Sequence, residues 1–260
     1  MQELALIKLG GSVITFKERA LAANEDAISK ISSTLAKISI PVIIVHGGGS
    51  FGHYWSVRYD MHTRPSDYDP QGVAIVHESM IRLNQIIINS MIQKGLPAYS
   101  VQPAVFTSSR KPIASRIREI FTMAKKIIPV TFGDVVHTDG SKFSILSGDA
   151  LMTTIAKALK PSKVIFATNV DGLYRDVRSR DLIDQVGFEK AKTGVAEPTI
   201  SFSGVKGMDV TGGMHRKVLE SKNIASLGID VVMLNGLEPE RILDALEGRR
   251  VIGTVFRGAN

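Results

Sequence analysis

A glycine-rich run with a histidine at its end follows an apolar segment near residue 45. The run reads Gly47-Gly48-Gly49-Ser50-Phe51-Gly52-His53 and comes directly after Val42-Ile43-Ile44-Val45-His46. Because glycine has no Cβ, its backbone N–H groups can approach an anion closely, and a helix that begins there adds the positive end of its dipole. The pattern therefore predicts a phosphate-binding loop with a histidine at its rim.

Two other nucleotide-binding loops share this glycine spacing. The glycines of residues 47–52 match the dinucleotide pattern G-x-G-x-x-G, which also needs an acidic residue about 20 positions later at a strand end. The candidates Asp67 and Asp69 lie instead between two prolines, where a loop is expected. A P-loop would need Lys in place of His53, and Ser or Thr in place of Tyr54. Anion binding, a purely structural turn and a dinucleotide fold all stay open at this point.

Two further glycine-rich segments point to more than one bound phosphate. Lys8-Leu9-Gly10-Gly11-Ser12 ends the first apolar run, and Thr211-Gly212-Gly213-Met214 opens a segment that carries Lys217. Three such loops, with lysines to offset negative charge, suit a nucleoside triphosphate held together with a second anionic group.

The composition is that of a globular protein with one large α/β domain or two lobes in contact. The chain has 260 residues, 44% of them apolar, and no cysteine, which excludes disulfides, thiolate nucleophiles and cysteine metal sites. It contains no apolar run of about 18 residues and no secretory leader pattern. We therefore expect a cytoplasmic protein that does not enter a membrane.

The net charge of +7 favours a small anionic substrate over nucleic acid. Lysines and arginines are scattered, with short clusters such as Lys125-Lys126 and Arg249-Arg250, and no aromatic residues alternate with them to stack bases. The same positive field attracts a small, highly charged phosphate. We expect no nucleic-acid partner.

Short apolar runs alternate with longer periodic segments, which is the pattern of βα units and a mainly parallel sheet. The expected strands are residues 4–9, 42–46, 98–102, 127–132, 163–168 and 229–234. Helices are expected over residues 26–38, after the N-cap Asn24, and over 72–93, where apolar residues recur at helical spacing. Residues 134–144 indicate a hairpin around Thr138-Asp139-Gly140-Ser141.

Four ordered motifs, spread over nearly the whole chain, resemble the signatures of the amino acid kinase superfamily. They are Lys8-Leu9-Gly10-Gly11-Ser12, Ser147-Gly148-Asp149, Thr168-Asn169-Val170-Asp171-Gly172-Leu173-Tyr174 and Thr211-Gly212-Gly213-Met214-His215-Arg216-Lys217. Residues 47–53, together with Lys17 and Gly133-Asp134-Val135-Val136, resemble the isopentenyl phosphate kinases within that superfamily. The resemblance implies a three-layer αβα sandwich with a mainly parallel central sheet, the amino acid kinase fold.

The resemblance also implies an activity. Such enzymes use ATP and Mg²⁺ to phosphorylate isopentenyl phosphate to isopentenyl diphosphate by direct in-line transfer, in isoprenoid biosynthesis by the alternative mevalonate pathway. It further implies a homodimer. An N-terminal lobe, residues 1–160, would bind the phosphate acceptor and form the dimer, and a C-terminal lobe, residues 161–260, would bind ATP on the same continuous sheet.

By the same resemblance, five residues would carry the chemistry. Lys8 and Lys217 would contact the ATP phosphates, and Lys17 would stabilise the phosphoryl group in transfer. Asp149 would orient the lysines, and His53 would donate a hydrogen bond to the acceptor phosphate. Magnesium would be held mainly by ATP phosphates and water, since it keeps several waters, so no protein metal site is expected.

The resemblance assigns two larger sets of binding residues. The nucleotide set is Lys8, Gly10, Gly11, Ser12, Gly49, Thr168, Asp171, Gly172, Tyr174, Gly212, Gly213 and Lys217. The acceptor set is Gly48, Gly49, His53 and Gly148. An isoprenoid tail also needs an apolar slot, for which the candidates are Val73, Val76, Met80, Val130 and Ile145, although core packing explains these residues equally well.

Elementary phosphate chemistry agrees with these roles. A phosphate monoester has its second pKa near 6, so at neutral pH the acceptor is already largely a nucleophilic dianion and needs no general base. The obstacle is the meeting of two anions, and positioning with positive charge overcomes it.

Other functions remain as alternatives. A phosphonate kinase of the fosfomycin type comes first, and an acetylglutamate-type carboxylate kinase on the same fold comes next. A nucleotide-binding module without catalysis represents a different class. A dinucleotide oxidoreductase is disfavoured because the acid for the ribose is missing.

Overall fold

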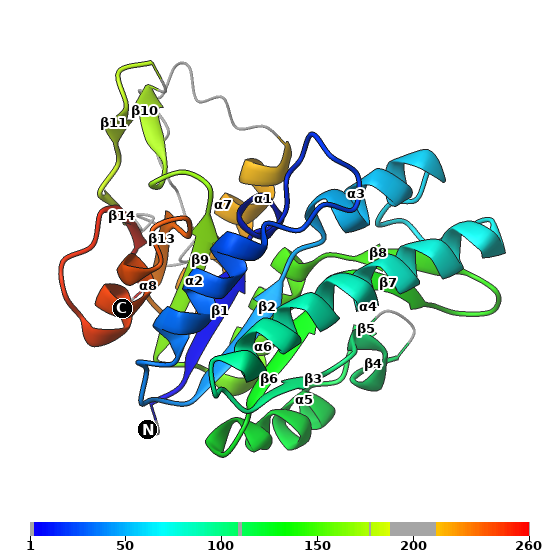
Figure 1. Cartoon of the computed structure of the whole chain (residues 1–260), viewed down its shortest axis with the longest axis horizontal. Helices are drawn as coiled ribbons and strands as arrows, with labels where there is room; N and C mark the ends of the chain where they lie inside the picture. The colour runs from blue at the N-terminus through cyan, green and yellow to red at the C-terminus, as the bar shows by residue number, and fades with distance from the viewer. Residues whose placement is uncertain (1–2, 109–110, 177, 188–211, 260) are drawn as a thin grey trace, which may run out of the picture.

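The computed structural model describes residues 3–108, 111–176, 178–187 and 212–259. Within them, one large sheet forms the centre of the molecule (Figure 1). Its strands, in the order in which they pair, are β12 (Gln185–Val186), β14 (Gly253–Phe256), β13 (Val231–Asn235), β9 (Lys163–Thr168), β1 (Ala5–Leu9), β2 (Val42–His46), β6 (Ile128–Phe132) and β3 (Ala98–Ser100). The strands from β13 to β3 are parallel, and β14 with β12 runs against them at one edge.

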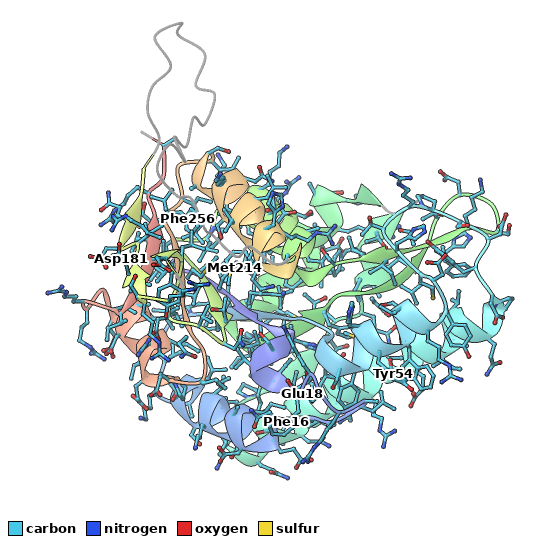
Figure 2. The ribbon with its side chains drawn as sticks, turned by 90° about the horizontal axis from the view of Figure 1, so that it is seen from above. Phe16, Glu18, Tyr54, Asp181, Met214 and Phe256 are labelled. Carbon is cyan, nitrogen blue, oxygen red and sulfur yellow. The ribbon has the colours of Figure 1, made fainter. Side chains whose placement is uncertain are left out.

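Helices cover both faces of this sheet. They are α1 (Gly11–Ile14), α2 (Glu25–Leu35), α3 (Gly49–Arg58), α4 (Pro70–Gln93), α5 (Ala114–Phe121), α6 (Gly148–Leu159), α7 (Gly212–Ala225) and α8 (Glu240–Glu247). Seen from above, α7 and α2 lie on opposite faces (Figure 2). The predicted three-layer αβα sandwich with a mainly parallel sheet is confirmed.

Smaller elements sit at the edges of the sandwich. Two-stranded pairs are formed by β4 (Thr107–Ser108) with β5 (Lys111–Pro112), β7 (Asp134–His137) with β8 (Phe143–Leu146), and β10 (Tyr174–Asp176) with β11 (Asp181–Leu182). Two 3₁₀ turns, η1 (Pro103–Val105) and η2 (Thr122–Lys125), flank α5. The β7–β8 pair is the predicted hairpin, with its turn at residues 138–141.

Side-chain alternation along β1 divides the core into two halves. Leu6 packs into the cluster beneath α5, α6 and α7, whereas Ala5, Ile7 and Leu9 pack into the cluster beneath α2, α4 and α8. Since successive strand side chains point to opposite faces, Lys8 shares the α6 side with Leu6. Burial of each large aliphatic side chain contributes about 1.5 to 3 kcal/mol, so a lysine in this strand gives up considerable stability.

The predicted bounds of helices and strands agree with the structure where capping or turn-forming residues mark the ends of the element. Strands β2 and β9 have the predicted bounds, and Asn24 caps α2 by accepting a hydrogen bond from the Ala27 N–H at 3.2 Å. Helix α4 begins earlier than predicted, at Pro70, because Asp69 accepts a hydrogen bond from the Gln71 N–H at 2.9 Å. Asp69 is therefore a helix cap, which is a further argument against a dinucleotide site.

The two lobes inferred from the sequence share the large sheet. Strands β1, β2, β6 and β3 come from residues before 160, and β9, β13, β14 and β12 come from residues after it. Each group is contiguous in the sheet, and the groups meet where β1 pairs with β9. The division of labour between the lobes stays a prediction.

Two glycines have a left-handed backbone, but only one of them is crowded by neighbouring atoms, so substitutions at the two sites distinguish the cost of backbone strain from the cost of crowding. Gly49 has φ +49°, and a Cβ built on it would lie 2.0 Å from Thr15 Oγ1, whereas Gly140 has φ +64° with no atom within 4 Å. We predict that Gly140→Ala lowers the free energy of unfolding by about 1 kcal/mol, the cost of a left-handed alanine. Gly49→Ala should cost about 3 kcal/mol, because overpacking adds to the same strain.

Urea denaturation of both variants measures this difference. Equal losses would show that the contact around Gly49 relaxes without cost, contrary to our expectation.

Candidate active site

The carboxyl ends of β1, β2 and β9 open into one cavity of about 1190 Å³. In open α/β sheets, ligands bind at this edge, where neighbouring strands send their connections in different directions. Two backbone bonds join the strand exits: the Gly10 N–H donates to the Ala167 carbonyl, and the Gly47 N–H donates to the Leu9 carbonyl, both at 2.9 Å. The loops after the three strands therefore form one connected floor.

Close approach between these loops requires glycine. A Cβ built on Gly11 would lie 2.3 Å from the Gly49 nitrogen, and one built on Gly148 would lie 2.8 Å from Lys8 Cε. Larger residues would force the loops apart and displace the lysine. The glycines are therefore required by the packing of the site as well as by any approach to an anion.

A carboxylate lies between two lysines beside this floor. Lys8 Nζ donates to Asp149 Oδ1 at 2.6 Å, and Lys217 Nζ donates to Asp149 Oδ2 at 3.3 Å. Lys217 also donates to the Gly213 carbonyl, one turn earlier in α7, at 3.3 Å. Asp149 is in the first turn of α6, whose N-cap Ser147 accepts a hydrogen bond from the Ala150 N–H. The structure thus brings together three residues that lie far apart in the sequence.

Burial and charge shift the pKa values of this group in opposite senses. Burial lowers the pKa of the Lys8 ammonium below 10.5; the ion pair with Asp149 opposes the shift, and the charge of Lys217 adds to it. Burial works to raise the pKa of the Asp149 carboxyl, but the two lysine charges and their hydrogen bonds outweigh it and hold the pKa below 3.8. Asp149 is therefore ionised at neutral pH, and the site carries an excess positive charge.

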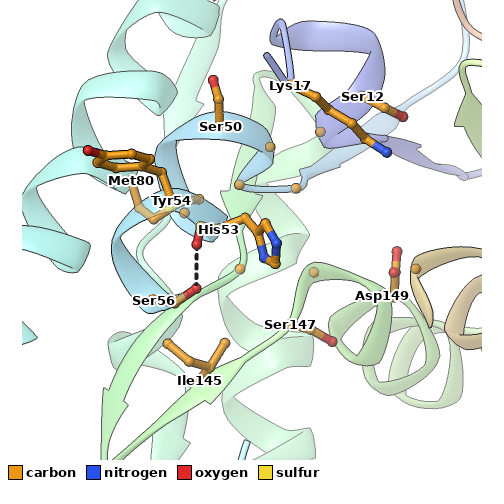
Figure 3. Close-up of a pocket in the computed structure, with 18 of the residues that line it drawn as sticks. Ser12, Lys17, Ser50, His53, Tyr54, Ser56, Met80, Ile145, Ser147 and Asp149 are labelled. Atoms are coloured by element: carbon orange, nitrogen blue, oxygen red, sulfur yellow. Dashed lines mark hydrogen bonds between the residues drawn. The ribbon is translucent and has the colours of Figure 1, made fainter. Parts of the chain in front are cut away.

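His53 and Lys17 face the same cavity from other elements. His53 is an exposed residue of α3, and Lys17 belongs to the loop between α1 and α2. Figure 3 shows the His53 ring and the Lys17 side chain around the space that Asp149 also borders. The five residues proposed from the sequence for the chemistry thus line one cavity.

One end of the cavity is apolar. Tyr54 and Val57 come from α3, Val76 and Met80 from α4, and Ile145 from the β7–β8 hairpin. Figure 3 shows Tyr54, Met80 and Ile145 on the side of the cavity away from Asp149. A polar end with cations and an apolar end with a thioether and aliphatic groups suit a ligand that is anionic at one end and hydrocarbon at the other.

Some residues that the sequence assigned to the site do not line the cavity. Val130 is fully buried in the core cluster beneath α2, α4 and α8, and Val73 packs in the cluster of Met61, Val76 and Val135. Gly10 lies behind the floor, where a Cβ would meet the Ala167 carbonyl oxygen at 2.8 Å. The other residues outside the cavity lining are Asp171, Gly172, Tyr174 and Gly212. Thr211, in the last of the four motifs, lies outside the described residues.

Asp171 is already engaged by side chains of the protein. Its carboxylate accepts hydrogen bonds from Arg241 at 2.5 Å, Tyr174 at 3.1 Å and Asn235 at 3.3 Å. The bond to Arg241 holds the pKa of Asp171 below its ordinary value. This carboxylate joins the β9 loop to α8. Arg241 has no sequence signal that would have marked it.

Sequence reasoning also missed polar contacts that hold the loops. Ser12 Oγ donates to Asn169 Oδ1 at 3.0 Å, which ties the β1 loop to the β9 loop. Asp134 accepts a hydrogen bond from His77 Nδ1 at 2.7 Å, which ties the hairpin to α4. That bond raises the pKa of His77, while burial raises the pKa of Asp134. His77 therefore serves to fasten the hairpin to α4.

His46 lies at the end of β2, beneath the floor. It is fully buried, stacks on Phe132 at 5.2 Å between ring centroids, and contacts Gly47 O and Asn84 Oδ1 through its two ring nitrogens. Burial lowers the pKa of His46 to about 4, so its imidazole is neutral at pH 7. It supports the glycine loop without adding charge.

Within the residues that the structure describes, no group of three or more histidine, aspartate or glutamate side chains is placed to hold a metal ion. Asp149 is unsuited to the task, since both its carboxylate oxygens already accept from lysines. Among the helices described, none is long and apolar enough to cross a membrane.

We predict that Asp149→Asn lowers the free energy of unfolding by about 3 kcal/mol at pH 7, because it leaves two cations without their shared anion. The folded-state pKa of Asp149 is depressed, so its stabilisation is present above pH 3.8 and is lost as pH falls further. The difference between the wild type and the variant should shrink in the same range. Urea denaturation at several pH values measures it.

Asp26→Asn is the matched control, because Asp26 pairs with Lys30 at 2.8 Å with both side chains largely exposed. It should leave the unfolding midpoint unchanged. An equal effect of both substitutions would contradict the importance of burial.

Comparison with known proteins shows which sequences and structures this chain resembles. Residues 3–235 match the amino acid kinase family. The isopentenyl phosphate kinases of Thermoplasma acidophilum and Methanothermobacter thermautotrophicus are 36% and 32% identical to it; both alignments cover 98% of this chain, with 100% and 99% of the relatives. The crystal structure of the T. acidophilum isopentenyl phosphate kinase product complex has a TM-score of 0.78 at 29% identity, covering 98% of this chain and 100% of that one. The chain belongs to the amino acid kinase family and, within it, to the isopentenyl phosphate kinases.

Proposed function

We propose that this kinase transfers the γ-phosphoryl group of ATP to isopentenyl phosphate and forms isopentenyl diphosphate and ADP. The observation that carries the proposal is the two-ended cavity, with the Lys8–Asp149–Lys217 group and the glycine loops at one end and an apolar wall at the other. An acceptor with a phosphate head and a short hydrocarbon tail matches both ends.

The reaction requires one bond to form and one to break. A phosphate oxygen of the acceptor attacks the γ-phosphorus while the bond from that phosphorus to the ADP oxygen breaks, and the electron pair leaves with ADP. The acceptor is largely a dianion at neutral pH, so no base is required. What the site must supply is alignment and positive charge.

We assign the positive charge to three lysines. Lys8 is held rigidly, since its side chain is only 3% exposed and bonded to Asp149. An arriving triphosphate would favour its charged form and so raise its lowered pKa. Lys217 would contact the same nucleotide from α7, and Lys17 would approach the transferring phosphoryl group from its loop. Asp149 would act by orienting Lys8 and Lys217.

We assign the acceptor phosphate to the β2 loop. The backbone N–H groups of Gly48 and Gly49 would bind it at the N-terminus of α3, with Gly148 close by. His53, one turn into α3, would donate a hydrogen bond to the same phosphate. Val76, Met80 and Ile145 would contact the tail.

We assign the nucleotide phosphates to the loops on the other side of the floor. The residues concerned that line the cavity are Gly11, Ser12, Gly49, Thr168 and Gly213. The segment from Asp171 to Tyr174 does not line the cavity. It would support the loop at the nucleotide end from the side away from the ligand, where Arg241 holds the Asp171 carboxylate in place. Magnesium would be held mainly by ATP phosphate oxygens and water, since it keeps several waters and both Asp149 oxygens are engaged by lysines.

We propose that the protein is a homodimer that pairs through the β3 edge of the sheet. Strand β3 is the last strand at this edge, and Tyr99 on it and Ile92 on the preceding helix are 54% and 55% exposed. A second copy would cover the open edge and these apolar side chains. Sedimentation should give twice the chain mass of 28.2 kDa, and a mass of one chain would refute the dimer.

The activity is tested with purified protein, ATP and Mg²⁺, by measuring ADP release with isopentenyl phosphate, fosfomycin and acetylglutamate as separate acceptors. We expect turnover with isopentenyl phosphate. Preferential turnover of fosfomycin or acetylglutamate would show that the proposed acceptor is wrong and that the kinase activity is right. ATP binding without any turnover would indicate a nucleotide-binding module.

We predict that His53→Ala raises KM for isopentenyl phosphate about tenfold, the effect of losing one hydrogen bond to a charged group. The dissociation constant for ATP, measured by calorimetry, should stay unchanged. His137→Ala, at an exposed histidine of the hairpin, is the control and should change neither constant. Equal weakening of ATP binding by His53→Ala would place this histidine on the nucleotide side.

A further inference from the structure

Thr15 joins the two glycine loops that face each other across the floor. It follows α1 directly and is 3% exposed. Its hydroxyl donates to the Gly11 carbonyl at 2.7 Å and accepts a hydrogen bond from the Ser50 N–H at 3.0 Å. One bond therefore ends on the β1 loop and the other on the first turn of α3.

The same side chain packs against the β2 loop. A Cβ on Gly49 would lie 2.0 Å from Thr15 Oγ1 and 2.8 Å from Thr15 Cγ2, so the threonine occupies the space beside the Gly49 α-carbon. The positive φ of Gly49 turns the backbone around this side chain. Thr15 therefore lies against the loop, and its hydroxyl is the group that also bonds to it.

Thr15 also decides which amides of α3 stay available to a ligand. The first N–H groups of a helix have no partner within it. The N–H groups of Phe51 and Gly52 bond to the Gly48 carbonyl, and that of Ser50 bonds to Thr15. In the described part of the chain, the N–H groups of Gly48 and Gly49 donate to no protein acceptor.

The β1 loop has a corresponding pair of amides. The N–H groups of Gly11 and Ser12 likewise donate to no acceptor among the described residues, whereas that of Val13 bonds to Gly10. The four residues that carry these donors line the same cavity from two loops. The hydroxyl of Thr15 bridges these loops from behind.

We propose that Thr15 is a positioning residue that sets the separation of these two donor pairs, and through it the separation of the γ-phosphate and the acceptor phosphate. The inference rests on the proposed function. Each loop keeps its own donors when the bridge is cut, so both substrates should still bind. The alignment of the attacking oxygen with phosphorus is what should be lost, and a misplacement of about 1 Å can cost a hundredfold in rate.

Thr15→Val tests the bridge because it keeps the shape of the side chain and removes both hydrogen bonds. We expect kcat to fall about a hundredfold, with both KM values within about threefold of the wild type. Thr15→Ser retains the hydroxyl and should keep kcat within about threefold. Thr154→Val is the matched control: Thr154 makes the same type of bond, to the Ala150 carbonyl four residues earlier, but touches neither loop.

The outcomes separate this inference from the proposed function. An inactive wild type with isopentenyl phosphate would defeat the proposed function alone. An active wild type with unchanged kcat in Thr15→Val, or with raised KM and unchanged kcat, would defeat the role of Thr15. So would an equal loss in Thr15→Ser, because the methyl group would then be what matters.

Amide hydrogen exchange of the wild type provides a measurement that needs neither variant nor substrate. The Ser50 N–H should exchange more slowly than those of Gly48 and Gly49, since it alone has a protein acceptor. Equal exchange of the three amides would also overturn the proposal.

Discussion

One carboxylate shared by a buried ammonium group, Lys8, and a partly buried one, Lys217, is the constraint around which the site is built. Lys8 could not remain charged inside the α6 half of the core without Asp149, and Asp149 could not remain ionised there without the lysines. The local backbone sequence accommodates these ion pairs. Gly148 is a glycine in contact with the Lys8 side chain, and Ser147 caps the helix that presents Asp149. The sheet therefore carries a polar cluster at the point where three of its strands end.

The second constraint is the close approach of backbone to backbone. Gly11 and Gly49 pack with no room for a side chain, and Thr15 lies beside Gly49 with a hydroxyl that bonds to both loops. This is compatible with tight binding of anions, because the amides that remain free are held by neighbours whose own hydrogen bonds are complete. The cost is a segment with little tolerance for substitution.

The parts of this structure that the sequence predicted are those marked by strong local signals. Residues 42–46 and 163–168 are apolar runs with polar or glycine residues at their ends, and they form β2 and β9 with those bounds. Strands β12 and β14 were missed, because two to four residues are too few to show a period and because their pairing depends on distant partners. Lys8, His53 and Asp149 were predicted from motifs and from chemistry unusual for their surroundings, and they line one cavity.

Other site residues could not be found without the fold. Val130 has the right chemistry for an apolar wall, but only the sheet shows that its strand position turns it toward α4. Arg241 and Asp171 are 70 residues apart, and Thr15 and Ser50 are 35 apart, so no local pattern indicates that they touch. Hydroxyl groups that bridge loops leave almost no sequence signal, since threonine is common everywhere.

The β7–β8 hairpin is hydrogen-bonded as its own pair, outside the eight-stranded sheet that holds Lys8. It reaches the cavity through Ile145 and is fastened to α4 by the bond between His77 and Asp134. The second strand of the hairpin continues directly into Ser147, Gly148 and Asp149 at the start of α6. One continuous segment therefore carries both Ile145 of the apolar wall and the carboxylate that binds the two lysines, so a change in the turn at residues 138–141 would disturb the lysines less than a change next to Leu146.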